Sequence, residues 1–400
     1  MQKVVFPNGL TAIYAPKPGK SVVLEIMSKI GSNDEKPPEQ GITHFIEHML
    51  FEGTKKWPTN RLLSNQIERI GGDFNAYTTS ERTCFYIKAL QKHFPLAVEV
   101  LADMIQQPLF EEAYLKKERH IVIKEIDLMN DEPKYYQWIL LLRHLFQKHP
   151  AQFPTYGNKK ILRRLTRLPV LRYFQKHYRP NNMVIAIVGN VPHWKELIRT
   201  NFVFLRKPLS RKRQVSEPQA TRSIFVKTKR DIANAYLVIG FKTVPHLHAD
   251  AYVLEVINGI LGRGQSGRMF TELRGKQGLA YDVGTQHIAE VTYGFFAVYA
   301  TVDKKNVGLV KDLALQELEK LKEITWLDVK EAQDYIEGSY YLGMDDGQKL
   351  ADQLLFWEQV RDVGLMQHYI EKIKIVTPAD VKRVAEKYFK NPTIAAVEGK

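Results

Sequence analysis

Two histidines and a glutamate stand together in the segment Gly-Ile-Thr-His-Phe-Ile-Glu-His-Met-Leu-Phe-Glu-Gly at residues 41–53. In a helix, His44 and His48 lie one turn apart on the same face, and Glu47 lies beside them. Two imidazoles at this spacing can bind one metal ion, and a neighbouring carboxylate can take a proton from a water molecule at that ion. The residue types and their spacing therefore indicate metal-assisted hydrolysis.

A five-residue pattern is short enough to arise by chance, and histidines on helices are often solvated or hydrogen-bonded within a core. The surrounding residues favour a metal site. A turn-rich segment at 31–38 precedes the predicted helix, and the apolar residues of that helix predict that it is buried. Burying two histidines and a glutamate without partners is costly, whereas a metal ion satisfies both imidazoles at once.

A third ligand is available on another predicted amphipathic helix, at residues 111–130. Glu118, Val122 and Glu125 occupy positions i, i+4 and i+7, so they share one face of that helix. A stripe with two carboxylates is equally consistent with an ordinary surface helix. The residues alone leave open whether either glutamate completes a metal site.

Strands and helices alternate around these two helices. Strands are predicted at 12–15 and 21–30, a hairpin-like pair at 73–90 and a buried central strand at 182–190, with helices at 58–70, 94–107 and 136–178. The segment 206–222 is basic and polar and contains two prolines, which is typical of a linker.

A similar order of elements returns after the linker. Strands are predicted at 223–228, 235–242 and near 280–301, helices at 249–261, 304–323 and 327–342, and a final helix and a strand at 393–397. We therefore expect an α+β fold of two homologous domains, 1–205 and 223–400, each a mainly antiparallel sheet packed with helices. The helix at 249–261 has no histidine pair, so we expect only the first domain to bind metal in this way.

The composition is that of a globular protein with room for two cores: 400 residues, 44% hydrophobic and 26% charged. The lone Cys84 excludes a disulfide framework and a site of several thiolates, so histidine and carboxylate would hold any zinc. The N-terminal segment lacks an apolar run long enough for a signal peptide, and no apolar run has membrane-spanning length, so we expect a cytoplasmic protein with no membrane partner.

The net charge of +14 raises the alternative of a nucleic-acid or anionic-surface binder. The basic residues are scattered, and no helix-turn-helix, zinc-finger or RNP pattern is present. The glycine-rich stretch at 259–267 lacks the strand-turn-helix context of a phosphate loop. A solvated basic surface is therefore favoured, and no nucleic-acid partner is expected.

Seven motifs, in order along nearly the whole chain, resemble those of the pitrilysin family of zinc metallopeptidases. The resemblance is to the short-chain group, which includes the β-subunit of mitochondrial processing peptidase and its bacterial relatives. The motifs are "FPNGL" (6–10), "GSNDE" (31–35), "GITHFIEHMLFEGT" (41–54), "GGDFNAYTTSERTCFY" (71–86), "ERHIVIKEI" (118–126), "YRPNNMVIAIVGN" (178–190) and "RMFTELRGKQGLAY" (268–281).

The resemblance implies one Zn²⁺ per chain, with His44, His48 and Glu125 as ligands, because the second glutamate of "ERHIVIKE" matches the family's zinc-binding one. Glu118 matches the first glutamate of that motif and is expected to support the ligands from behind. Glu47 would act as the general base, without a covalent intermediate.

Two further functional roles follow from the resemblance. Arg274 and Tyr281 match residues of the family's second domain that stabilise the oxyanion, although a surface arginine and a core tyrosine are the ordinary alternatives. An edge strand beside the zinc would bind the substrate as an added strand. That strand comprises Phe74, Asn75, Ala76, Tyr77 and Thr78, with Asn75 and Ala76 as the main contacts.

The family encloses its substrate in a clamshell of four such domains, and this chain supplies two, half of a clamshell. The resemblance therefore implies a homodimer, or a heterodimer with an inactive homologous subunit. Processing-peptidase β-subunits carry acidic residues where this chain has Tyr135 and Ile139, which argues against presequence specificity. We expect a zinc endopeptidase for short or unfolded peptides. The alternatives are the catalytic subunit of a heterodimeric processing peptidase and a non-catalytic structural or assembly subunit.

Overall fold

The computed structural model describes residues 1–206, 208, 215–218 and 222–399, which form two compact units. Unit 1 comprises Met1–Asp127, Pro154–Gln214 and Gly343–Met366; unit 2 comprises Leu128–Phe153, Val215–Leu342 and Gln367–Lys400. Much of the predicted linker at 206–222 lies outside the described residues. Each unit therefore draws segments from both halves of the sequence.

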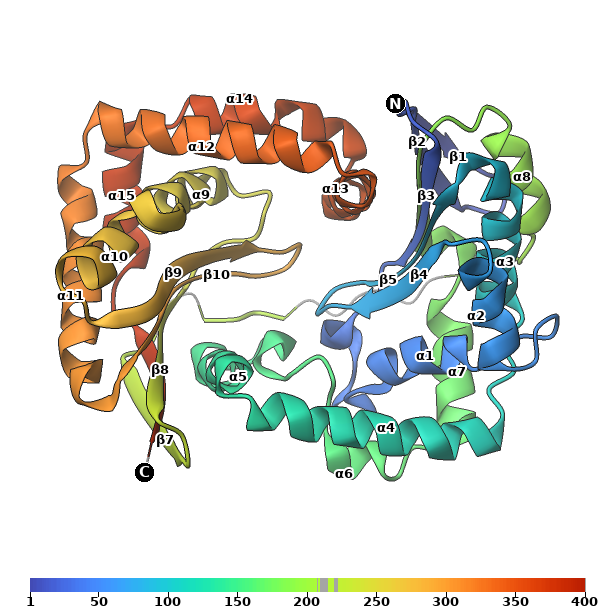
Figure 1. Cartoon of the computed structure of the whole chain (residues 1–400), viewed down its shortest axis with the longest axis horizontal. Coiled ribbons are helices and arrows are strands. Elements are labelled where there is room, and N and C mark those ends of the chain that lie inside the picture. Colours follow the sequence, from blue (N-terminus) through green and yellow to red (C-terminus); the bar gives the residue numbers. More distant parts are fainter. Residues whose placement is uncertain (207, 209–214, 219–221, 400) are drawn as a thin grey trace. The chain divides into compact units, whose positions relative to one another are not determined.

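Unit 1 is built on a six-stranded mixed sheet in the order β1-β2-β6-β3-β5-β4. Figure 1 shows β3, β5 and β4 of this sheet side by side. The β2–β6 pair is parallel and the other pairs are antiparallel. β6 is buried at every residue, as the continuous apolar run in its sequence predicts. The strands are β1 (Gln2–Val5), β2 (Thr11–Ala15), β3 (Ser21–Ser28), β4 (Asp73–Thr78), β5 (Thr83–Leu90) and β6 (Met183–Val188).

Helices cover both faces of this sheet. Along β3, Val22, Leu24 and Ile26 pack into the larger core, whereas Val23 and Met27 pack into a second core on the opposite face. The larger core is closed by α1 (Ile42–Phe51), α2 (Asn60–Glu68), α3 (Phe94–Gln106), α4 (Glu112–Asp131), α7 (Arg167–His177) and α8 (Trp194–Asn201), with the short α6 (Lys159–Leu162) between α4 and α7 in the sequence.

The second face of the unit 1 sheet is covered by α13 (Gly347–Val360), which comes from the C-terminal half of the sequence. Ala351, Leu354 and Leu355 of α13 are fully or almost fully buried in the second core. Tyr77 adds a polar contact, because its hydroxyl donates to Asp352 Oδ1 at 2.5 Å and lies 3.1 Å from Glu25 Oε1. α13 is therefore an integral part of unit 1.

Unit 2 repeats the topology with a five-stranded mixed sheet in the order β7-β11-β8-β10-β9. Taken in chain order, these strands occupy the positions of β2 to β6 in unit 1, again with one parallel pair. The strands are β7 (Ile224–Arg230), β8 (Asn234–Lys242), β9 (Ala280–Ala289), β10 (Gly294–Asp303) and β11 (Thr393–Gly399). The predicted α+β fold with two similar, mainly antiparallel sheets is confirmed.

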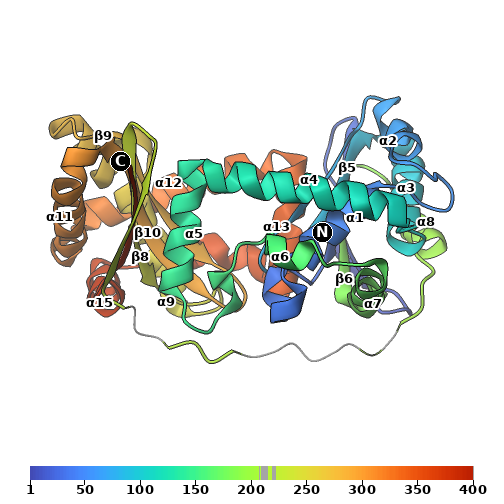
Figure 2. The same ribbon diagram turned by 90° about the horizontal axis from the view of Figure 1, so that it is seen from below.

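One face of the unit 2 sheet is covered by α5 (Pro133–Leu145) from the N-terminal half of the sequence. Leu140, Leu141 and Leu145 of α5 pack against β8, β10 and β11, and Figure 2 shows the helix alongside this sheet. The other helices of unit 2 are α9 (Ala249–Gly262), α10 (Arg268–Phe270), α11 (Val307–Glu319), α12 (Trp326–Met344), α14 (Tyr369–Lys374) and α15 (Pro378–Tyr388). The exchange of α5 and α13 between the two halves is thus reciprocal.

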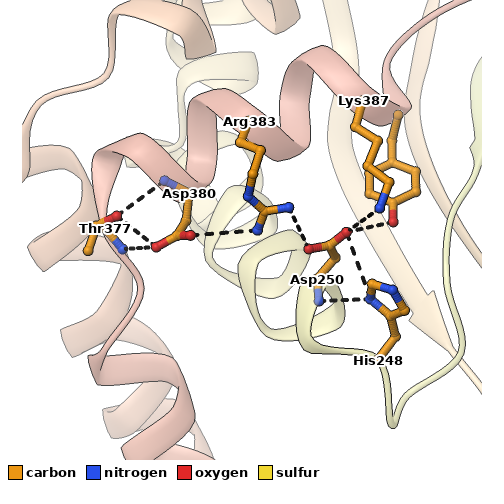
Figure 3. Close-up of polar contacts among 7 residues, drawn as sticks. His248, Asp250, Thr377, Asp380, Arg383 and Lys387 are labelled. Atoms are coloured by element: carbon orange, nitrogen blue, oxygen red, sulfur yellow. Dashed lines mark hydrogen bonds and ion pairs between the residues drawn. The ribbon is translucent and has the colours of Figure 1, made fainter.

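A buried carboxylate joins α9 to α15 (Figure 3). Asp250 is 3% exposed and accepts hydrogen bonds from Arg383 at 2.8 Å, Lys387 at 2.9 Å and Tyr388 at 2.7 Å. Its own N–H donates to the ring of His248, the residue that caps α9. Burial opposes ionisation of Asp250, but these partners outweigh it and lower its pKa to about 2.

The predicted elements at the metal motif, the hairpin and the central strand of the first half are confirmed, as are the strands and the 249–261 helix of the second half. β1, α8, α13 and α14 were not predicted. No helix within the described part of the chain is long and apolar enough to cross a membrane.

Candidate metal centre

The metal motif lies on α1 as expected, and this helix has one polar face and one buried apolar face. Ile42, Phe45, Ile46, Met49 and Leu50 are almost fully buried, and they hold the helix against the core of unit 1. The three residues that remain partly exposed within 42–50 are His44, Glu47 and His48. Their i, i+3 and i+4 spacing brings them together on the open side of the helix.

Glu125 of α4 faces both imidazoles. Its Oε1 lies 3.8 Å from His44 Nε2, and its Oε2 lies 3.4 Å from His48 Nε2. The two imidazole rings are 4.7 Å apart and nearly perpendicular. Within the described part of the chain, this is the one group of three or more metal-ligating side chains whose ligand atoms all lie within 4.8 Å of one another.

The donor set fits zinc. Two ligands at about 2.1 Å from a tetrahedral zinc ion are about 3.4 Å apart, close to the observed separations of the nitrogens and Glu125. Two imidazole nitrogens and one carboxylate leave a fourth position for water, as in catalytic zinc sites. The predicted set of His44, His48 and Glu125 is therefore assembled by the structure as a candidate zinc site.

Glu118 also lies on α4, seven residues before Glu125, and it contacts the other ring nitrogen of His48. Its Oε2 lies 3.2 Å from His48 Nδ1, so this ring nitrogen is occupied and Nε2 is directed to Glu125. Lys117 lies within 3.3 Å of Glu118 and donates to Glu52 at 3.1 Å. The role of Glu118 in supporting the zinc ligands stays a prediction. In contrast to His48 Nδ1, His44 Nδ1 is buried with no hydrogen-bond partner among the described residues.

The charges around the site shift the pKa values of both histidines. Burial and repulsion from His48 lower the pKa of His44 to about 4. Burial also acts to lower the pKa of His48, but hydrogen bonds to Glu118 and Glu125 outweigh it and raise the value to about 9. The same hydrogen bonds from His48 lower the pKa of both glutamates, although burial opposes this at each.

Glu47 is the third polar side chain on the open side of α1. Burial raises its pKa above the usual value, while the hydrogen bond from Thr78 and the nearby His48 act in the opposite direction. A raised carboxyl pKa brings the group closer to neutral pH, where a general base works best. Thr78 Oγ1 donates to Glu47 Oε2, a contact that the sequence reasoning did not anticipate.

The sequence reasoning also missed Glu35, which caps α1. Its two carboxylate oxygens accept hydrogen bonds from Gly41 N at 2.8 Å and Thr43 N at 2.9 Å. These N–H groups belong to the first turn of the motif helix, where a carboxylate is favoured. An acidic residue shortly before a helix is the sequence signal, but Glu35 lies six residues upstream of Gly41, beyond the usual capping position.

The predicted substrate strand, β4, forms one edge of the described sheet of unit 1. Phe74 packs against Phe51 of α1 with ring centres 4.8 Å apart, so the strand is held beside the motif helix. Ala76 N donates to Oδ1 of the neighbouring Asn75 at 2.8 Å. The side chain of Tyr77 points to the opposite face, toward α13, so only its backbone is available on the edge.

Arg274 and Tyr281 lie near each other in unit 2. Arg274, in a π-helix at Thr271–Lys276, donates to the backbone carbonyl of Tyr281 at 2.7 Å. Both residues are exposed, and Tyr281 is 59% exposed at the start of β9, so it is not a core tyrosine. Their catalytic role stays a prediction.

Known proteins match the chain over most of its length. The family description "Insulinase (Peptidase family M16)" matches residues 11–159, and "Peptidase M16 inactive domain" matches residues 164–335. An uncharacterized zinc protease of Streptomyces coelicolor is 30% identical, with 96% of this chain and 86% of that protein covered. One from Rickettsia bellii is 27% identical, with 98% and 96% covered.

The fold is also that of solved structures. A protease from Helicobacter pylori superimposes with a TM-score of 0.94 over 99% of both chains, at 21% sequence identity. The chain therefore belongs to peptidase family M16, the pitrilysin and insulinase family of zinc proteases. The His44, His48 and Glu125 cluster is its candidate zinc site.

Proposed function

We propose that this protein is a zinc-dependent endopeptidase that hydrolyses short or unfolded peptides. The observation that supports it most strongly is the convergence of His44, His48 and Glu125 with Glu47 beside them on α1. Zinc held by His44, His48 and Glu125 would supply a Lewis acid for the scissile carbonyl and would lower the pKa of a water molecule. Glu47 would take a proton from the attacking water and give it to the leaving amine.

Substrate selection follows from the edge strand. β4 offers unpaired backbone groups along its outer side, and Asn75 currently accepts the N–H of Ala76. A peptide that is added as a strand would replace this contact with backbone hydrogen bonds. Because backbone pairing reads little sequence, the enzyme would prefer extended or unfolded segments. Arg274 and Tyr281 are our candidates for stabilising the oxyanion.

The quaternary structure is part of the same proposal. We infer that the chain acts as a homodimer, and a heterodimer with an inactive homologue is the alternative. Activity of the chain purified alone would favour the homodimer, whereas activity only after addition of a homologous subunit would favour the heterodimer. The expected cytoplasmic location stays a prediction.

The test is cleavage of an unstructured, internally quenched peptide by the wild type, Glu47→Gln and the control Glu68→Gln, with zinc content measured for each. Glu68 is an exposed residue of α2, so its substitution controls for a generic loss of charge. We expect zinc in all three, cleavage by the wild type and the control, and a loss of at least about 100-fold in Glu47→Gln. Full activity of Glu47→Gln would contradict the mechanism.

A further inference from the structure

The last two residues of β4 are fixed from opposite faces of the strand. Tyr77 is held on one face, where its hydroxyl contacts Glu25 and Asp352. Thr78 is directed to the other face, where its hydroxyl donates to Glu47 Oε2. Successive side chains of a strand alternate in this way, so anchoring Tyr77 also fixes the direction of Thr78.

We propose that Thr78 is a positioning residue for the catalytic base: its hydroxyl holds one oxygen of Glu47 and leaves the other free to accept the proton of the attacking water. The inference rests on the proposed peptidase function, and it assigns the Thr78 side chain to the base instead of to the substrate. A β-branched side chain suits this role, because its χ1 angle has few accessible values.

The backbone around Thr78 is itself held to the entry of α1. Ser32 N donates to Thr79 O at 3.2 Å, and Asn33 N donates to Ser80 O at 2.7 Å. A Cβ on Gly31 would come within 2.3 Å of Glu81 N, so only glycine allows this close approach. The first residues of the segment 31–35 therefore bind the turn between β4 and β5.

The last residue of the same segment, Glu35, binds the start of α1, because its carboxylate accepts hydrogen bonds from Gly41 N and Thr43 N. The donor on β4 and the acceptor on α1 are therefore parts of one rigid frame. A substrate strand added to β4 would bind directly to the element that holds the base. Glu47 would then already be held in its orientation before the peptide binds, as preorganised catalysis requires.

The experiment compares Thr78→Val, which keeps the shape but removes the hydroxyl, with Thr78→Ser, which keeps the hydroxyl. Thr228→Val is the matched control, since Thr228 lies on β7 of unit 2 and is likewise half-buried on a strand. Zinc content, thermal stability, kcat and KM for the quenched peptide are measured for each. The two Thr78 variants are also made in the Glu47→Gln background.

We expect Thr78→Val to bind zinc normally and to lose about 10- to 100-fold in kcat, with KM changed by less than about twofold. Thr78→Ser should recover most of kcat, and Thr228→Val should match the wild type. In the Glu47→Gln background, Thr78→Val should lower the residual rate by less than about twofold, because the group that it positions is already lost.

Three outcomes would overturn the inference: an unchanged kcat in Thr78→Val, a change in KM alone, or equal losses in Thr78→Ser and Thr78→Val. Should Thr78→Val fail to fold, Thr78→Ala and Thr78→Ser provide the same comparison. A wild type that is inactive both alone and with a homologous subunit would refute the proposed function and this inference together. An active wild type with a fully active Thr78→Val would refute the inference alone.

Discussion

His48 contacts a carboxylate through each of its ring nitrogens. Nε2 faces Glu125 at 3.4 Å and Nδ1 faces Glu118 at 3.2 Å. The contact with Glu118 fixes the orientation of the ring and raises the basicity of Nε2, which makes this nitrogen a stronger metal ligand. His44 has no such partner at Nδ1 among the described residues, so the two histidines are supported unequally.

This inequality makes Glu118 a testable contributor to zinc affinity. Glu118→Gln keeps an acceptor oxygen near His48 but removes the negative charge, so we expect zinc to bind about 10- to 100-fold more weakly. Zinc affinity is measured by competition with a chelator, and Glu112→Gln at the exposed start of α4 serves as the control. Equal affinities of the variant and the wild type would show that Glu118 plays no part in holding the metal.

The second prediction at the residue scale concerns Arg274 and Tyr281. If both stabilise the oxyanion, Arg274→Ala and Tyr281→Phe should retain zinc and each lower kcat by about 10- to 1000-fold. The exposed Lys276, in the same π-helix, provides the control Lys276→Ala. The measurement is steady-state cleavage of the quenched peptide with zinc content checked. An unchanged kcat in both variants would leave the two residues as ordinary surface groups.

Among the elements, α9 and α15 show how a buried charge fixes two helices to each other. Asp250 is 3% exposed, and the three side chains that donate to its carboxylate come from α15 (Figure 3). Removing Asp250 leaves the buried Tyr388 hydroxyl without its acceptor, whereas Arg383 and Lys387 are about half exposed and can be hydrated. The network therefore supports the packing of unit 2, and it lies on helices that carry none of the metal ligands.

Because the folded pKa of Asp250 is about 2, below the unfolded value of about 3.9, the group stabilises the fold above pH 4. This contribution is lost as the pH falls from about 4 to about 2. We expect Asp250→Asn to lower the free energy of unfolding by about 1–3 kcal/mol at pH 7. The deficit relative to the wild type should shrink as the pH falls through that window.

Urea unfolding of the metal-free protein at several pH values between 2.5 and 7 measures this deficit. Asp334→Asn is the control, since Asp334 forms an exposed i, i+4 pair with Lys330 on α12 and should contribute little. A deficit that stays constant down to pH 2.5 would mean that the charge of Asp250 is not the source of its stabilising effect.

The elements near the site were largely predictable because their signals are local. The apolar residues around His44 and His48 have helical spacing, and the helix Ile42–Phe51 has that spacing in the structure. Short elements gave weaker signals: β1 has four residues, most of them exposed, and it is stabilised by pairing with β2. The hydrogen bond from Thr78 to Glu47 depends on how a strand packs against a helix, which periodicity does not determine.

At the scale of the whole molecule, the exchange of α5 and α13 is the feature that the sequence could not show. The helix α13 was not predicted, and the helical region predicted at 136–178 does not say which sheet will cover α5. The structure places α13 on the sheet of unit 1 and α5 on the sheet of unit 2. The predicted division into 1–205 and 223–400 stays a prediction about the sequence repeat, while the compact units cross it.

The exchange predicts that neither half of the chain is stable alone. Fragment 1–210 lacks α13, so a sheet face that includes Ile13, Val23 and Met27 would be exposed to water. Fragment 211–400 lacks α5, which exposes Val238 and Ala395 on the other sheet. We expect each fragment to aggregate when expressed alone. Expressed together, the fragments should co-purify, bind zinc and cleave the quenched peptide.

The control for this experiment places charge on the inner side of α13. Leu354→Asp together with Leu355→Asp puts two carboxylates into a core where both leucines are almost fully buried, at a cost of several kcal/mol. With these substitutions, fragment 211–400 should no longer keep fragment 1–210 soluble. Zinc binding should be lost as well, although all the candidate zinc ligands lie in fragment 1–210. A soluble, zinc-binding fragment 1–210 on its own would show that α13 is dispensable for unit 1. Failure of the control to separate the fragments would show that α13 does not hold them together.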